Sequence, residues 1–505
     1  MDCFALLVRK GVPLAQAILA AALLGSTALA LEIPANKPPA DAPKSAPAPT
    51  TAPAPAPAPV PAPAPGTTTA TEAPARPATR EDQKSVYRDF RTDFDARRYA
   101  EARPLAERAV EITDQLDGRD SMALVTPLNN LAQTAYQLKD YSAAEENYLR
   151  SIKIIETHAA HSPRLPHTLF GLGRVYVAAG QREFAITMFK RAVEITRKSD
   201  GLFSTNQLPF LLPLIDAYAT ADHVSDQDSQ EQYLVSIAER NYSPQSPEFI
   251  GAVLRQAAWQ ERQFKFIAAR RLYSQAIELI RRAGDVRDVR QVNPLRGIAR
   301  CYRSEFLYGA VDAESKDPVM TDNGFGMGTP APLQNQNRLE PEGERLLQTA
   351  LSLLQNANGP AGTRLKRDTT IDLGDWNWIA GVQKTAIQNY ATAWDLMTTA
   401  ERASAGPDNP LAQPYLLVYT APRAASKSSK ARPEDIEEKF VQMKFPVNAQ
   451  GKAGDIKVTN SDASESQQKA VMAAMHRALY RPRLVDRKPA ATEGVEFREI
   501  LYNKR

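Results

Sequence analysis

The apolar residues of positions 127–156 recur at helical spacing in two groups, and a short polar turn separates the groups. The first group ends at Tyr136 and the second begins at Ala144, with Lys139 and Asp140 between them. Apolar positions that recur every three or four residues are typical of one face of a helix. The segment therefore predicts a hairpin of two short helices. One hairpin cannot bury both apolar stripes alone, so we expect further copies on either side.

The second helix of each hairpin carries a repeated triplet: a small residue, a bulky residue four positions later, and another small residue seven positions after the first. The triplets are Ala144-Tyr148-Ser151, Ala185-Phe189-Ala192, Ser229-Tyr233-Ser236, Ala269-Tyr273-Ala276, Gly343-Leu347-Ala350 and Ala386-Tyr390-Ala393. Small residues let neighbouring helices approach, and the bulky residue fills the space between them. With units of about 42 residues, the pattern predicts a mainly α-helical array over residues 83–403.

These residues resemble the tetratricopeptide repeat family, whose hairpins carry small residues at the same places. The long repeat and the run Leu128-Asn129-Asn130-Leu131-Ala132 are similar to the repeats of kinesin light chains. The resemblance implies an α-solenoid that binds proteins or extended peptides along the first helices of its hairpins. An ordinary helical bundle is the alternative interpretation.

Positions counted from Leu131, Leu172 and Ile298 give nine candidate peptide-binding residues on these first helices. They are Asn129, Gln133, Tyr136, His167, Phe170, Arg174, Asn293, Arg296 and Arg300. An asparagine amide can bond to both backbone groups of a peptide, and an arginine can bind a carboxylate through two parallel hydrogen bonds. We therefore expect a mildly basic surface that favours acidic peptides. The alternative is a set of solvated polar residues without a ligand.

Residues 1–30 have the pattern of a signal peptide, because Arg9 and Lys10 precede an apolar segment that ends in Ala28-Leu29-Ala30. The uncharged residues 11–31 also approach the roughly 20 residues of a membrane span, so an uncleaved inner-membrane anchor is the alternative. Residues 31–82 are rich in proline and alanine and predict a disordered, extended tether. Both alternatives predict an exported protein.

The spacing of apolar residues changes from residue 411 onward. A strand-like run at 415–419 is followed by alternation at 441–447, a second hairpin arm at 456–458, an amphipathic helix at 464–479 and a last strand at 495–502. The order strand, strand, helix, strand predicts a small α+β domain over residues 411–505.

This region resembles the C-terminal domain of the energy transducer TonB. The resemblance is carried by Phe445-Pro446-Val447, Ile456-Lys457-Val458, Tyr480-Arg481-Pro482 and Asp486-Arg487-Lys488-Pro489. Arg487 stands where the family usually has glycine, and Pro446 removes an amide from the first strand. The resemblance implies a partner-binding edge strand, here with Val495, Phe497 and Leu501, and a partner from the outer membrane. It also implies a periplasmic location in a Gram-negative bacterium.

Composition and isolated chemical groups give no indication of catalysis. The net charge of +4 gives no reason to expect nucleic acid as a partner. Cys301 lies within a predicted repeat helix, so we expect a buried thiol. His158, His161 and His167 have no acid or thiol at ligand spacing beside them. We therefore expect neither an enzyme nor a cofactor or metal site.

Two functional hypotheses follow from this organisation. The first is a periplasmic scaffold or adaptor that binds proteins or peptides through its repeats and its TonB-like domain. The second is an energy transducer that couples an inner-membrane motor to transport by an outer-membrane receptor. Retention or cleavage of residues 1–30 distinguishes them.

Overall fold

A computed structural model describes residues 78–159, 162–219, 223–284, 286–308, 320–321, 329–330, 339–406, 408–422 and 436–504. The described residues up to Gln181 belong to one compact unit, the N-terminal unit, and those from Arg182 to another, the C-terminal unit. The predicted signal segment and nearly all of the predicted tether lie outside the described residues. Among the helices that are described, none has both the length and the apolar character that crossing a membrane requires.

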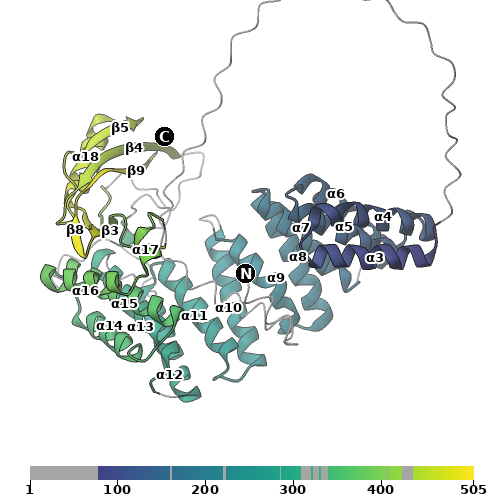
Figure 1. Ribbon diagram of the computed structural model, residues 1–505, viewed down its shortest axis with the longest axis horizontal. Coiled ribbons are helices and arrows are strands. Elements are labelled where there is room, and N and C mark those ends of the chain that lie inside the picture. Colours follow the sequence, from purple (N-terminus) through teal and green to yellow (C-terminus); the bar gives the residue numbers. More distant parts are fainter. Residues whose placement is uncertain are drawn as a thin grey trace, which may run out of the picture. The chain divides into compact units, whose positions relative to one another are not determined.

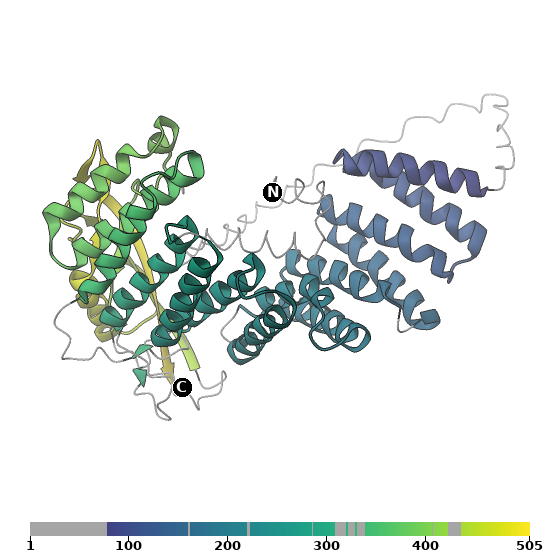
Figure 2. The ribbon, with the colours of Figure 1, turned by 90° about the horizontal axis from the view of Figure 1, so that it is seen from below.

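The N-terminal unit consists of antiparallel helices joined by short turns (Figure 1, Figure 2). Its helices are α3 (Arg80–Asp95), α4 (Tyr99–Asp117), α5 (Val125–Gln137), α6 (Tyr141–Ala159) and α7 (Arg164–Ala178). A capping box between Thr79 and Asp82 begins α3, slightly before the predicted start at residue 83. Arg97 and Lys139 adopt positive φ in the turns after α3 and α5, which places the second turn where the sequence predicted it.

The C-terminal unit continues the hairpins and ends in strands. Its helices are α8 (Arg182–Asp200), α9 (Leu208–Ala217), α10 (Val224–Asn241), α11 (Pro247–Arg262), α12 (Phe266–Ala283), α13 (Val292–Tyr308), α14 (Pro341–Leu353), α15 (Pro360–Ile379), α16 (Gln383–Asp395), α17 (Thr399–Ala403) and α18 (Glu465–Arg477). Its strands are β1 (Met320–Thr321), β2 (Thr329–Pro330), β3 (Tyr415–Val418), β4 (Ile436–Val447), β5 (Lys457–Ser461), β6 (Leu479–Arg481), β7 (Arg483–Val485), β8 (Lys488–Ala490) and β9 (Thr492–Lys504).

The repeated triplets form the contacts between helices, with one exception described below. Their members are buried in α6, α8, α12, α14 and α16. The ring of Tyr148 packs directly over Gly171 of the following helix, α7, and Tyr273 packs in the same way over Gly297 of α13. A Cβ atom added at Gly297 would lie 2.6 Å from the Tyr273 ring, so the pairing of ring and glycine sets the approach of the two helices.

The triplet Ser229-Tyr233-Ser236 was assigned to the wrong face of its helix. Ser229 is exposed, whereas α10 buries Gln227, Glu231 and Leu234. The Glu231 carboxylate is fully buried and lies 3.1 Å from the Arg255 Nε of α11. A buried charge requires a partner, and this ion pair therefore holds α10 in a rotation that the apolar pattern did not reveal.

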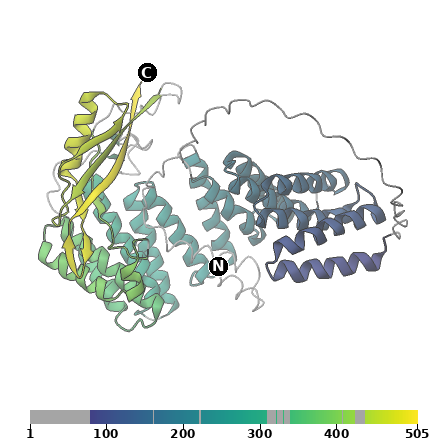
Figure 3. The same cartoon turned by 45° about the horizontal axis from the view of Figure 1, so that its top comes forward.

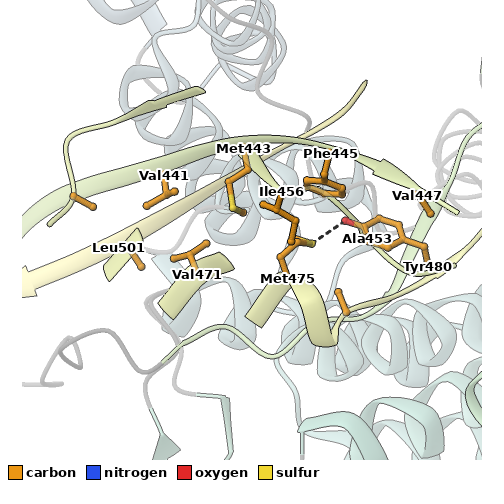
Figure 4. Packing of buried hydrophobic residues seen from close by; sticks show 12 residues of the cluster. Val441, Met443, Phe445, Val447, Ala453, Ile456, Val471, Met475, Tyr480 and Leu501 are labelled. Atoms are coloured by element: carbon orange, nitrogen blue, oxygen red, sulfur yellow. Dashed lines mark hydrogen bonds between the residues drawn. The ribbon is translucent and has the colours of Figure 1, made fainter. Parts of the chain in front are cut away.

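The main C-terminal sheet has the strand order β5-β4-β9, with antiparallel pairing throughout. Alternate residues of β4 point toward α18, where Val441, Met443 and Phe445 pack against Val471 and Met475 (Figure 4). The predicted order of strand, strand, helix and strand is therefore present. The register shifts between Phe445 and Val447, at the proline that lacks an amide donor.

Among the described residues, three strand pairs lie outside this sheet, and the first is β1 with β2. The β3 strand pairs with β6, and β7 pairs with β8 through a turn at Asp486 and Arg487. Arg487 has φ of +68°, a conformation that glycine adopts without strain. Its Nε lies 2.7 Å from Asp395 Oδ1 of α16, so this arginine connects the turn to the last hairpin.

The hydrophobic core is continuous across residues 403–411, where the sequence predicted a domain boundary. Trp378 of α15 and Tyr390 of α16 share one buried cluster with Leu411, Leu417 and Leu484. The predicted boundary marks a change from helices to strands, whereas the packing joins the two regions (Figure 1, Figure 3).

The contact between Tyr148 and Gly171 makes α7 sensitive to a single methyl group. We expect Gly171→Ala to destabilise the protein by about 1–3 kcal/mol, because the methyl group would overlap the Tyr148 ring. Chemical denaturation followed by circular dichroism measures the loss. Combining it with Tyr148→Leu should recover part of the stability; a Gly171→Ala variant as stable as the parent would contradict the contact.

Glu499 gives the C-terminal strands a distinct pH dependence. It lies on the α18 side of β9 and is 5% exposed, and burial raises its pKa to about 7 despite the opposing effect of Tyr419. In the unfolded chain the pKa is near 4.5, so the carboxyl group favours unfolding increasingly as the pH rises from about 4.5 to 7.

We expect Glu499→Gln to remove this decrease in folding stability with rising pH. The size of the pKa shift corresponds to about 3 kcal/mol. Denaturation measured at pH 5 and pH 8 should show a smaller decrease in stability for the variant than for the parent. Glu496→Gln, on the exposed face of the same strand, is the control and should retain the parent's decrease. Equal pH dependence in all three proteins would refute the assignment to Glu499.

Candidate peptide-binding site

Helices α5 and α7 bring together an arginine and two aromatic rings. The Arg174 Cζ lies 4.7 Å from the ring centroid of Tyr136 and 5.8 Å from that of Phe170. A guanidinium beside aromatic faces gains cation–π attraction. Its N–H donors point outward in the plane of the guanidinium. No carboxylate of the described residues forms an ion pair with Arg174. This part of the surface can therefore accept an anionic group from a ligand.

Asn129 lies on the same helix pair and has one amide atom without a partner. Its Nδ2 donates to Thr168 Oγ1 of α7 at 2.9 Å, whereas its Oδ1 is buried without a hydrogen bond among the described residues. Gln133 is half-buried on α5, and His167 is exposed on α7. Although the residue is exposed overall, partial burial of its imidazole ring lowers the pKa of His167. The side chains offer both donors and acceptors to a peptide backbone.

The candidates on α13 have different surroundings, because carboxylates of this chain form ion pairs with Arg296 and Arg300. The Arg296 Nε lies 2.6 Å from Asp372 Oδ2, and Arg300 forms two hydrogen bonds of 2.8 and 3.0 Å with Glu261. Burial acts to raise the pKa of Asp372, but the nearby Arg296 outweighs it and the pKa is lowered. The predicted basic surface is therefore neutralised here, and Arg300 binds an internal carboxylate in the way expected for a ligand. Asn293 is exposed.

The ion pairs on α13 continue toward the C-terminal strands. Arg303 lies 3.9 Å from Asp375 of α15, whose carboxylate also binds Arg481 of β6. The sequence analysis did not predict Asp372 and Asp375, the acids that pair with these arginines. The signal was present, because Arg296, Arg300 and Arg303 recur at helical spacing on α13 and Asp372 and Asp375 on α15.

The strand β9 lies at an edge of its sheet, since β4 is its neighbour on one side only. Val495, Phe497 and Leu501 face the core that α18 covers, and Leu501 is buried. The side chains of these three residues are thus less accessible than the sequence suggested. A partner strand would pair with the backbone of β9 and meet the outward-facing Glu496, Arg498 and Ile500.

The groups considered for chemistry lie apart. Cys301 is buried, and burial raises the pKa of its thiol far above the ordinary value. The described residues contain no group of histidine, cysteine and acidic side chains that could hold a metal ion. His161 lies outside the described residues.

One family model and several solved structures are similar to parts of this chain. Residues 92–157 match the family model described as tetratricopeptide repeat. The chain resembles TPR-like repeats of a protein named as a kinesin light chain in Podosopora anserina, at 18% identity and a TM-score of 0.36, over 40% of this chain and 96% of the other. It also resembles the C-terminal part of a TPR repeat-containing protein from Cytophaga hutchinsonii, at 14% identity and a TM-score of 0.35, over 63% and 96%.

No curated protein matches this chain. The family match confirms tetratricopeptide repeats at residues 92–157, which lie in the N-terminal unit and include α5. Repeats of this family generally mediate protein–protein interactions, so the coarse expectation of a protein or peptide partner stands.

Proposed function

We propose that this protein is an exported scaffold or adaptor whose N-terminal unit binds an acidic peptide across α5 and α7. The observation that carries the proposal is Arg174, which lies between two aromatic rings without an ion-pair partner among the described residues. A carboxylate of the peptide would bind the N–H donors of the Arg174 guanidinium.

The contrast within the chain supports the choice of this helix pair. Arg296 and Arg300 occupy corresponding predicted positions on α13, yet each is already held by an internal carboxylate. A ligand carboxylate at α13 would have to displace Asp372 or Glu261 from a partly buried ion pair, which opposes binding there. At Arg174 no such exchange is needed.

The TonB-like resemblance adds a second surface to the proposal. The open edge of β9 supports pairing with an extended segment of a partner, which the resemblance suggests is an outer-membrane protein in a periplasmic setting. The signal-like residues 1–30 are in keeping with export.

The alternative is an energy transducer whose uncleaved residues 11–31 anchor it in the inner membrane. The uncharged length of that segment favours this alternative. The helical repeats between tether and terminal strands favour the adaptor, because they interrupt a direct connection for force.

The role of Arg174 can be tested by selecting acidic heptapeptides from a displayed library on the full chain and synthesising the strongest binder. We expect Arg174→Ala to weaken binding of that peptide by about 10- to 100-fold, the usual range for a hydrogen bond to a charged group. Arg108→Ala is the control, since Arg108 lies on α4 in an exposed pair with Glu111 and should not change affinity. Equal affinity of the parent and the Arg174→Ala variant would refute the site.

The N-terminus of the mature protein separates the two functions. For an adaptor we expect N-terminal sequencing to begin at Leu31 and the protein to appear in the soluble periplasmic fraction. A retained N-terminus in the inner membrane, together with loss of receptor-dependent uptake on deletion of residues 431–505, would establish the transducer instead.

A further inference from the structure

The end of the helical array at α16 is covered by strands that come from two separate parts of the chain, residues 415–418 and 479–485. We infer that β3, β6 and β7 form a cap that replaces the helix expected after the last hairpin, and that Arg481 fixes this cap to α15. The C-terminal strands and the last repeats are then one cooperative unit, and β9 is displayed on a rigid support. This inference concerns the chain itself and does not depend on the proposed ligands.

The last hairpin has an apolar face that requires a cover. In earlier hairpins, the aromatic residue of the second helix packs over a glycine of the following helix, as Tyr148 does over Gly171. Tyr390 of α16 instead packs over Gly374 of α15, the preceding helix of its own hairpin. Ala386, Tyr390 and Ala393 are nonetheless fully buried. Another element therefore covers the face that a following helix would otherwise cover.

That cover is apolar and comes from the strand region. Leu411, Leu417 of β3 and Leu484 of β7 belong to the same buried cluster as Tyr390 and Trp378. The Leu484 N–H donates to the Leu411 carbonyl at 2.8 Å, which joins β7 to the segment before β3. The strands β3 and β8 lie beside α15 and α16 in two views (Figure 1, Figure 3). The cap is thus held together by this hydrogen bond as well as by its contacts with the helices.

One buried ion pair fixes the orientation of the cap. The Arg481 Nη1 lies 3.1 and 3.0 Å from the two carboxylate oxygens of Asp375, and these side chains are only 6% and 4% exposed. The Arg481 Nη2 donates to the Pro410 carbonyl at 3.1 Å, and the Tyr390 hydroxyl donates to Asp375 Oδ1 at 2.9 Å. One carboxylate therefore connects α15, α16 and β6. Removing either charge leaves the other buried and unpaired, which is strongly destabilising.

The alternative is an independent C-terminal domain that contacts the repeats without stabilising them. In that case, a change in one region would leave the local stability of the other unaltered. The cap requires the opposite, because loss of the ion pair uncovers the apolar face of α16 and the strands together.

The test is hydrogen–deuterium exchange of the full chain, read separately for α15–α16 and for β3, β6 and β7. Arg481→Met keeps much of the apolar stem and removes the charge from the strand side; Asp375→Asn removes it from the helix side. We expect each variant to raise exchange at least about tenfold in the element that does not carry the substitution. The control is Lys469→Met, which removes an exposed positive charge from α18 and should leave α15–α16 unchanged.

The two variants give the inference two separate ways to fail. Exchange that rises only in the strands for Arg481→Met, with α15–α16 as protected as in the parent, would overturn it. The same holds if Asp375→Asn affects the helices and leaves β3, β6 and β7 as protected as before. Reciprocal loss of protection across the boundary supports the cap.

Discussion

The structure depends on one requirement, that the inward-packing face of each hairpin is covered by a neighbouring element. No hairpin can satisfy this alone, since the face that packs inward is completed by the next helix in the chain. The ring of Tyr273 over Gly297 shows how closely the helices approach where the requirement is met. The composition of each second helix, the glycines of the helices that follow and the cover at the end of the array are all consequences of it.

The charges of equivalent helices differ along the array, although the packing is similar. On α13 the arginines lie between acids of α11 and α15, so they stabilise the array and are not available to partners. On α7 the corresponding guanidinium, that of Arg174, lies against aromatic rings, and no acid of the described residues forms an ion pair with it. Similar residues at similar repeat positions thus have different roles because the neighbouring helix differs.

The sequence predicted what local spacing encodes. The hairpins, the turn at Lys139, the triplets on most second helices and the strand alternation at 441–447 follow from residues that contact their near neighbours. The sequence did not predict features that depend on a contact with a residue of another helix. The rotation of α10 depends on Arg255 of the next helix, and the ion pair of Arg300 depends on Glu261 of α11, neither of which periodicity reveals. The pairing of β3 with β6, about 60 residues later in the chain, is non-local in the same sense.

The shared core at the end of the array also constrains how such a chain can change in length. Repeat proteins grow and shrink by duplication or loss of whole hairpins, since each copy contacts only its neighbours. A duplicate inserted after α16 would separate Tyr390 from Leu411 and Leu484, which complete its surroundings. Copy number is therefore free to vary only upstream of α15, and the final hairpin must be inherited together with the strands that follow it.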